Sequence, residues 1–175
     1  MENLVYFGGR GLVLIRNPLR AILSAYQHYK NGVHSGSEVQ LRNNILEALE
    51  NRDKKIDYED FEKFAFNHLN SWRDIILDWI ILGKQVLVVY FEDFLENKFS
   101  QMEKVFDFLK ISRDEERMKC LQYATIDFYR RKNDYAKEIR FSNNLKRKAN
   151  EIVKEVDKIL KRVGHPSLPN SYLNS

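Results

Sequence analysis

The chain has 175 residues, 43% of them apolar and 31% charged, a composition typical of one globular domain with its own core. No uninterrupted apolar stretch approaches the roughly 18 residues of a membrane-spanning helix, because Asp78 interrupts the best candidate. The single cysteine, Cys120, excludes an internal disulfide framework and a cysteine-rich zinc site.

The net charge is only +4, but it is unevenly distributed along the chain. Residues 128–164 contain twelve Lys and Arg against five Asp and Glu, whereas residues 92–127 contain six against nine. A basic C-terminal third indicates a phosphate-bearing or polyanionic partner. A solvated helix face of mixed charge explains the same excess, so charge alone does not decide between the two.

The first expected element is a strand over 11–16, an apolar run that ends in Arg16. Such a continuous run is typical of a strand buried on both faces of a parallel sheet. Asn17 and Pro18 then provide an N-cap and a first helical residue, and apolar residues recur at helical spacing as far as Tyr29. In open α/β sheets, ligands bind beyond the carboxyl ends of the strands, which is where this strand places Arg16.

The middle of the chain predicts two helices and a second strand. Ser37 and Gln40 form a capping box for a helix over 38–51. A long helix is expected over 58–82, and the apolar run 86–91 predicts another buried strand. Two such strands separated by helices predict right-handed crossovers in a parallel sheet.

The last third of the sequence predicts mainly helices. Ser112 and Glu115 form a capping box that opens a helix toward Cys120. Three other segments are expected: a helix over 99–109, a loop over 125–141 and an amphipathic helix over 145–163. Gly164 is the expected stop of that last helix.

The expected fold class is therefore α/β, with a parallel sheet flanked by helices. Two strands are few for such a domain, and the sequence opens within a few residues of a buried strand. We therefore expect residues 1–175 to form a single domain that is the helix-rich C-terminal part of a larger one and lacks its N-terminal portion.

The most informative motif runs from Arg16 to Ser24. A guanidinium at the end of a strand can bind a phosphate through two parallel hydrogen bonds, and the adjoining helix N-terminus adds amide donors and a favourable dipole. Ser24 adds a hydroxyl from the polar side of the helix. Each residue alone is explained as well by a capping arginine or a solvent-facing serine, whereas the combination predicts a phosphate site.

This motif resembles that of the sulfotransferase family. Its members bind 3′-phosphoadenylyl sulfate (PAPS) through Arg-x-Pro and a serine eight positions after the arginine, and Arg16, Pro18 and Ser24 match this pattern. Three further segments resemble the family in the same order: Ser71-Trp72, the strand and Glu-Asp ending of 86–93, and the basic segment Phe128-Tyr-Arg-Arg131. Within the family, the chain is most similar to the sulfotransferase-like domain of WSC domain-containing proteins.

The resemblance implies a P-loop-like α/β fold and transfer of a sulfuryl group from PAPS to a hydroxyl or amine acceptor, here a carbohydrate. It implies that Arg16, Ser24 and Arg130 hold the 3′-phosphate of PAPS or of the spent donor, adenosine 3′,5′-bisphosphate, and that Arg131 adds positive potential. It implies no metal and no nucleic acid partner. The WSC-type resemblance implies a Golgi location, whereas other family members are cytoplasmic.

Other features of the sequence leave alternatives open. The chain has no counterpart of the family's 5′-phosphosulfate loop, a Gly/Thr-rich turn with a lysine, and none of its four histidines matches a general base, so the catalytic residues are unassigned. A non-catalytic module that binds nucleotide or sulfated glycans is therefore a second hypothesis. A nucleic-acid binder that uses the basic C-terminal helix is a third.

Several other candidates favour structural roles over chemistry. The histidines lack metal-ligand spacing and are expected on surfaces. Glu92 and Asp93 are expected to form hydrogen bonds at a strand end rather than to act as paired acids. Trp72 and Trp79 lie seven residues apart on one helix face and are expected in the core.

Overall fold

The computed structural model of the chain describes residues 9–30, 58–123 and 141–173. Its elements, in chain order, are β1 (Arg10–Ile15), α2 (Pro18–Lys30), α4 (Tyr58–Leu82), β2 (Gln85–Tyr90), α5 (Phe91–Glu96), α6 (Lys98–Leu109), α7 (Glu115–Tyr123), α10 (Asn143–Arg162) and the 3-10 turn η2 (Asn170–Tyr172). The expected helix over 38–51 with its capping box, and nearly all of the expected loop over 125–141, lie outside the described residues.

The two strands are parallel and pair along their whole length, from Arg10 opposite Gln85 to Ile15 opposite Tyr90. The prediction of a parallel sheet is thus confirmed, and in the described part of the chain this sheet has two strands. Both strands end at the same edge, so the residues that follow Ile15 and Tyr90 lie next to each other. That edge carries the candidate site.

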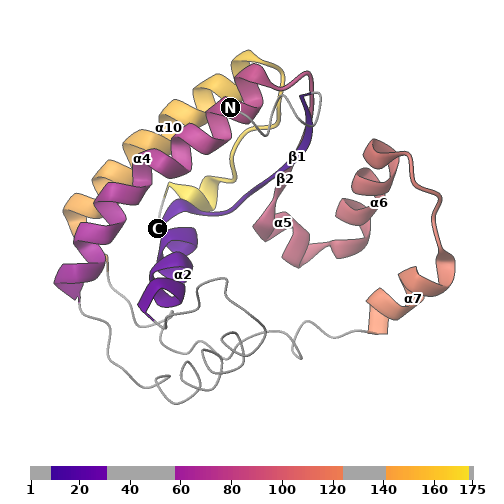
Figure 1. Ribbon diagram of the computed structural model, residues 1–175, viewed down its shortest axis with the longest axis horizontal. Helices are drawn as coiled ribbons and strands as arrows, with labels where there is room; N and C mark the ends of the chain where they lie inside the picture. The colour runs from indigo at the N-terminus through magenta and orange to yellow at the C-terminus, as the bar shows by residue number, and fades with distance from the viewer. Residues whose placement is uncertain (1–8, 31–57, 124–140, 174–175) are drawn as a thin grey trace, which may run out of the picture.

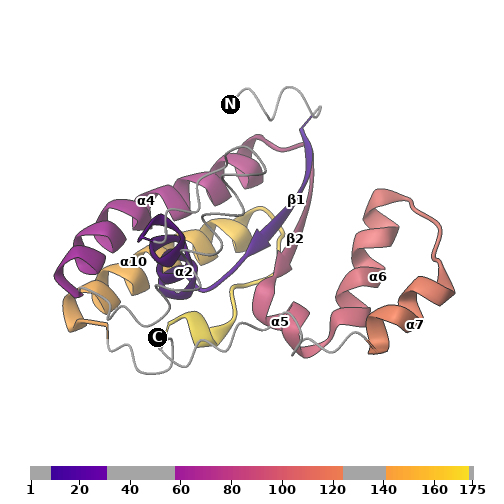
Figure 2. The same ribbon diagram turned by 60° about the horizontal axis from the view of Figure 1, so that its bottom comes forward.

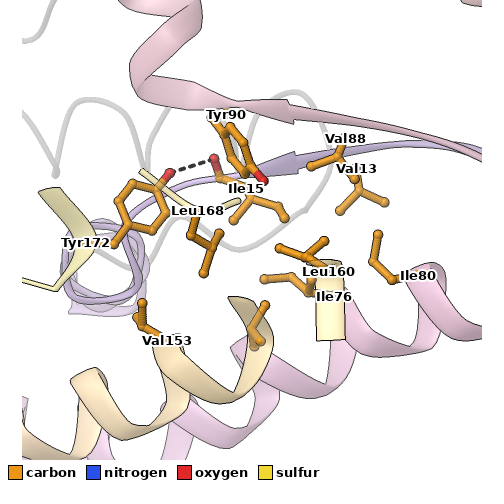
Figure 3. Packing of buried hydrophobic residues seen from close by; sticks show 11 residues of the cluster. Val13, Ile15, Ile76, Ile80, Val88, Tyr90, Val153, Leu160, Leu168 and Tyr172 are labelled. Carbon is orange, nitrogen blue, oxygen red and sulfur yellow. Dashed lines mark hydrogen bonds between the residues drawn. The ribbon is translucent and has the colours of Figure 1, made fainter. Parts of the chain in front are cut away.

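Helices α4 and α10 lie side by side and cover one face of the sheet, while α6 and α7 lie on its other side (Figures 1 and 2). The core between the sheet and the α4–α10 pair is apolar (Figure 3). Its buried members are Val13, Ile15, Ile76, Ile80, Val88, Tyr90, Val153, Val156, Leu160, Leu168 and Tyr172. Burying apolar side chains from both strands, both helices and the C-terminal segment in one layer stabilises the sheet against the helix pair.

A second apolar cluster joins α2 to the N-terminal halves of α4 and α10. It includes Leu19, Ile22 and Tyr26 from α2. The Tyr26 ring meets Phe61 edge-on at 5.3 Å, and its hydroxyl donates to Asp60 Oδ2 at 2.9 Å. The helix that carries Ser24 of the candidate phosphate motif is therefore held by packing along its own apolar face.

The expectation that β1 is buried on both faces is wrong. Val13 and Ile15 face the helices and are buried, but Leu12 is 41% exposed and Leu14 is 54% exposed. The reason lies in the packing, because α4 and α10 cover only one face of β1. On β2, α5 and α6 pack beside the strand, and Val89, the partner of Leu14, is 3% exposed.

The structure also corrects one helix start. In α7 the cap is Asp114, whose Oδ1 accepts hydrogen bonds of 3.1 Å from the amides of Glu116 and Arg117, so the predicted Ser112–Glu115 capping box is wrong. The stop of α10 is confirmed, since Gly164 has a φ of +82°, the left-handed conformation in which glycine is favoured.

Within the described parts of the chain, no helix is both long enough and apolar enough to cross a membrane.

Candidate functional site

Arg16 follows directly after β1, at the carboxyl edge of the sheet. Its side chain is half-buried, and the guanidinium lies 4.6 Å from the centre of the Phe91 ring, the first residue after β2. A cation over an aromatic face is attracted by the ring quadrupole. The structure therefore places the predicted phosphate-binding arginine at the ligand edge of the sheet and fixes it between the ends of both strands.

The main chain at Arg16 is held by the long helix α4. Trp72, in the middle of this helix, donates a hydrogen bond of 3.1 Å from its indole nitrogen to the carbonyl oxygen of Arg16. Trp72 also packs against both apolar clusters, so the expected core role is confirmed and a polar contact is added. The Ser-Trp segment and the Arg-x-Pro segment are thus parts of one local structure.

Glu92, two residues after β2, forms a hydrogen bond to the turn between β1 and α2. Its Oε1 accepts a hydrogen bond of 3.3 Å from the amide of Asn17, and its Oε2 accepts one from the hydroxyl of Tyr172. The Tyr172 hydroxyl also lies 3.1 Å from the carbonyl oxygen of Ile15. The expected role of Glu92 as a hydrogen-bonding group at a strand end is confirmed.

Charges of both signs surround the half-buried Arg16 guanidinium. Burial is the largest influence and lowers the pKa of Arg16; Glu92 raises it, and Arg20 lowers it. An arginine side chain nevertheless stays protonated at ordinary pH, so the result is a partly desolvated cation with a second cation nearby. An anion bound between Arg16 and Arg20 would reduce their mutual repulsion.

The N-terminus of α2 supplies fewer amide donors than the sequence suggests. The Asn17 amide is used by Glu92, and the Arg20 amide donates to Asn17 Oδ1 at 3.2 Å. Pro18 has no amide hydrogen. Asn17 is therefore confirmed as a cap, and recognition of an anion at this turn falls mainly to side chains.

Arg20 is a candidate that the sequence reasoning overlooked. It is exposed on α2 one turn before the half-buried Ser24, so the two side chains lie on the same face of the helix. The usable signal in the sequence is the spacing of four residues from Arg16 to Arg20 and four more to Ser24. Arg20 and Ser24 thus follow each other along one side of the helix, and Arg20 is near enough to lower the pKa of Arg16.

The remaining predicted site residues are not brought into this arrangement. Arg130 and Arg131 lie outside the described residues. His68 is exposed and stacked on Phe64 at 3.8 Å, as expected of a surface histidine. In the parts of the chain that the structure describes, no group of three or more His, Cys, Asp or Glu side chains could hold a metal ion.

Comparison with known proteins gives a family match. A family model described as "Sulfotransferase domain" matches residues 10–161, which is most of the chain. The matched segment includes both strands, the Arg16 turn and Trp72. No solved structure matches the chain significantly.

Proposed function

Because this chain belongs to the sulfotransferase domain family, a family of transferases, we propose that its domain transfers a sulfuryl group from PAPS to a hydroxyl or amine of a carbohydrate. The observation that carries this proposal is the half-buried Arg16 guanidinium at the carboxyl edge of the parallel sheet. A P-loop-like sheet belongs to the same proposal.

In this proposal the 3′-phosphate of the donor binds at the turn between β1 and α2. Arg16 provides a bidentate, charge-assisted contact, Arg20 adds charge, and Ser24 adds a hydroxyl. Arg130 and Arg131 are proposed to approach the same phosphate from their own segment. The amides of Asn17 and Arg20 do not contribute, since both are engaged within the turn.

The transfer breaks the bond between sulfur and the bridging oxygen of the donor and forms a bond from sulfur to the acceptor oxygen or nitrogen. The acceptor loses a proton, and adenosine 3′,5′-bisphosphate leaves. By analogy with phosphoryl transfer, the work of the protein is positioning and stabilisation of charge. Arg16 contributes by holding the donor at the end that does not react.

Calorimetric titration with adenosine 3′,5′-bisphosphate tests the proposed donor site. The chain should bind this ligand more tightly than adenosine 5′-monophosphate, because only the first carries the 3′-phosphate. Equal affinity for the two nucleotides would show that the turn after β1 does not recognise a 3′-phosphate.

A non-catalytic module that binds nucleotide or sulfated glycans is the second candidate. It is favoured by the lack, in this sequence, of a counterpart to the 5′-phosphosulfate loop. For the same reason we expect residues 1–175 alone to bind the bisphosphate without turnover of PAPS on a panel of sugar acceptors. Turnover would contradict that expectation and exclude the non-catalytic candidate.

The WSC-type resemblance extends the proposal to the location of the protein in the cell. A domain of this type would act on glycans in the Golgi, whereas a relationship to other sulfotransferases would place it in the cytoplasm. Imaging of the tagged full-length protein beside a Golgi marker separates the two locations.

A further inference from the structure

The C-terminal segment after α10 runs back along the sheet toward the candidate site (Figures 1 and 2). It is attached at successive points on the way. The hydroxyl of Tyr90 donates to the carbonyl of Pro166, and the amide of Leu168 donates to Asp157 Oδ1 at 2.9 Å. Tyr172, at the end of this path, is 1% exposed.

The Tyr172 hydroxyl ends between the two strand ends, close to two acceptors. One is the carbonyl of Ile15, to which Figure 3 draws the hydrogen bond, and the other is Glu92. A hydroxyl has one hydrogen to donate, so the two acceptors share it in a three-centre hydrogen bond. The part of this bond that goes to the charged acceptor is the stronger one. Burial and the hydrogen bond to Glu92 both raise the pKa of Tyr172, which keeps its hydroxyl protonated as a donor.

These contacts constrain both peptide units that flank the α-carbon of Arg16. The preceding unit contains the Ile15 carbonyl, which Tyr172 contacts. The following unit contains the carbonyl of Arg16, bonded by Trp72, and the amide of Asn17, bonded by Glu92. With both units held, the direction in which the Arg16 side chain leaves the backbone is set.

We propose that Tyr172 is a positioning residue for the donor's 3′-phosphate, acting on Arg16 through Glu92 and the Ile15 carbonyl. This inference rests on the proposed function. The match to the family model ends at residue 161, so family membership by itself assigns no role to Tyr172.

The test compares Tyr172→Phe with Tyr90→Phe in the chain of residues 1–175. Each substitution deletes one buried hydroxyl that contacts a backbone carbonyl, but only Tyr172 also contacts Glu92. Two quantities are measured in each variant. The first is the ratio of affinities for adenosine 3′,5′-bisphosphate and adenosine 5′-monophosphate, and the second is amide hydrogen exchange at Asn17 and Arg20 relative to the core of α4.

Tyr172→Phe should reduce the affinity ratio by about fivefold to tenfold, the scale of one ordinary hydrogen bond, because Tyr172 acts on the phosphate only through other groups. It should also speed exchange at Asn17 and Arg20 by a similar factor relative to α4. Tyr90→Phe should lower the melting temperature and leave both quantities near the wild-type values. A purely structural role for Tyr172 would lower the melting temperature alone, and that result would overturn the proposal.

Glu92→Gln is the second variant, and it tests the positioning of Arg16 if Tyr172→Phe does not fold. Removing a negative charge beside Arg16 by itself strengthens binding of an anion. A reduced preference for the bisphosphate in this variant therefore reports lost positioning and supports the proposal, whereas an unchanged or increased preference contradicts it.

Failure of the proposed function gives a different result. If the wild-type chain does not distinguish the two nucleotides, the 3′-phosphate site is wrong. Hydrogen exchange then still decides whether Tyr172 positions the turn. Faster exchange of the Asn17 amide in Tyr172→Phe, but not in Tyr90→Phe, supports a positioning role for Tyr172. Equal exchange rates of this amide in the two variants refute that role.

Discussion

The indole nitrogen of Trp72 donates a hydrogen bond of 3.1 Å to the carbonyl oxygen of Arg16, across 56 positions of sequence. The contact joins the middle of α4 to the turn after β1, at the edge where the candidate ligand site lies. It gives a physical reason for the presence of a tryptophan there rather than a purely apolar residue, because the indole combines a large apolar ring system with a donor at its rim.

Replacing Trp72 by Phe should therefore destabilise the chain and loosen the site. The substitution leaves the Arg16 carbonyl without this partner, which costs about 1 kcal/mol of unfolding free energy beyond the loss of packing. Urea denaturation measures the stability, and bisphosphate titration measures the affinity. Trp79→Phe is the control, since Trp79 packs against the same core two helical turns further along α4. Equal loss of bisphosphate affinity in both variants would contradict a specific role for Trp72.

Arg16→Ala should abolish the preference for adenosine 3′,5′-bisphosphate over adenosine 5′-monophosphate. A charge-assisted hydrogen bond contributes roughly 1.5–3 kcal/mol, or about one to two decades in affinity. Arg16→Lys should also weaken binding, because a point charge does not reproduce the bidentate contact. Arg117→Ala removes the same charge from exposed α7 and should leave the preference unchanged; a folded Arg16→Ala protein that kept the preference would place the phosphate site elsewhere.

Ser24→Ala should have a smaller effect than either substitution of Arg16. A neutral hydroxyl contributes roughly 1 kcal/mol, which is about fivefold in affinity. The substitution also removes a poor helix former from α2, so stability should not fall. Calorimetry and thermal unfolding check both points, and a loss in Ser24→Ala larger than that in Arg16→Ala would reverse the assigned roles.

Asp114→Ala should cost on the order of 1 kcal/mol of unfolding free energy, the usual contribution of an N-cap, because two amides of α7 lose their acceptor. Ser112→Ala should be close to neutral, since the structure assigns the cap to Asp114. Nucleotide affinity should be unchanged in both variants, as α7 lies far from α2 in Figures 1 and 2. A costly Ser112→Ala and a neutral Asp114→Ala would restore the capping box that the sequence suggests.

The buried tyrosines should make the chain lose stability at alkaline pH. Burial is the main cause that raises the pKa of both Tyr90 and Tyr172 above the ordinary value of 10.0. A group whose pKa is higher in the folded state contributes stability that is complete below its unfolded pKa and is lost as pH rises above it. Above pH 10.0 each tyrosine should therefore reduce the unfolding free energy by up to roughly 1.4 kcal/mol per pH unit.

Urea denaturation between pH 8 and 11 checks this dependence. Tyr172→Phe and Tyr90→Phe should each show a shallower decline above pH 10.0 than the wild type, although both start from a lower stability. Parallel declines in all three proteins would show that these two tyrosines do not cause the alkaline loss of stability.

Short-range signals in the sequence predicted several elements correctly. The apolar runs located β1 and β2 to within one residue, and the spacing of apolar residues located α4 over 58–82. Asn17 and Gly164 act as the expected cap and stop. These signals work because a cap, a glycine with positive φ or an apolar stripe acts within one or two turns of chain.

The start of α7 shows where local signals compete. Ser112 and Asp114 are both suitable caps, and the choice depends on how the chain leaves α6. Lys110 adopts a left-handed conformation, with a φ of 57°, and its amide bonds back to Asp107. The chain turns there, and the helix then begins after Asp114.

By itself, the sequence predicted helices α2, α4, α6, α7 and α10, the parallel strands and the position of Arg16 at a strand end, because these follow from local propensity and from the edge at which parallel strands finish. It did not predict the short helix α5, since Phe91 reads as the last residue of the preceding apolar run. Only the tertiary structure decided that Leu12 and Leu14 stay exposed, since burial depends on what packs against a strand. It alone brought Trp72, Glu92 and Tyr172 to the Arg16 turn. Contacts between residues 56 to 157 positions apart leave no periodic or local trace in a single sequence, because they form only when separate elements pack together.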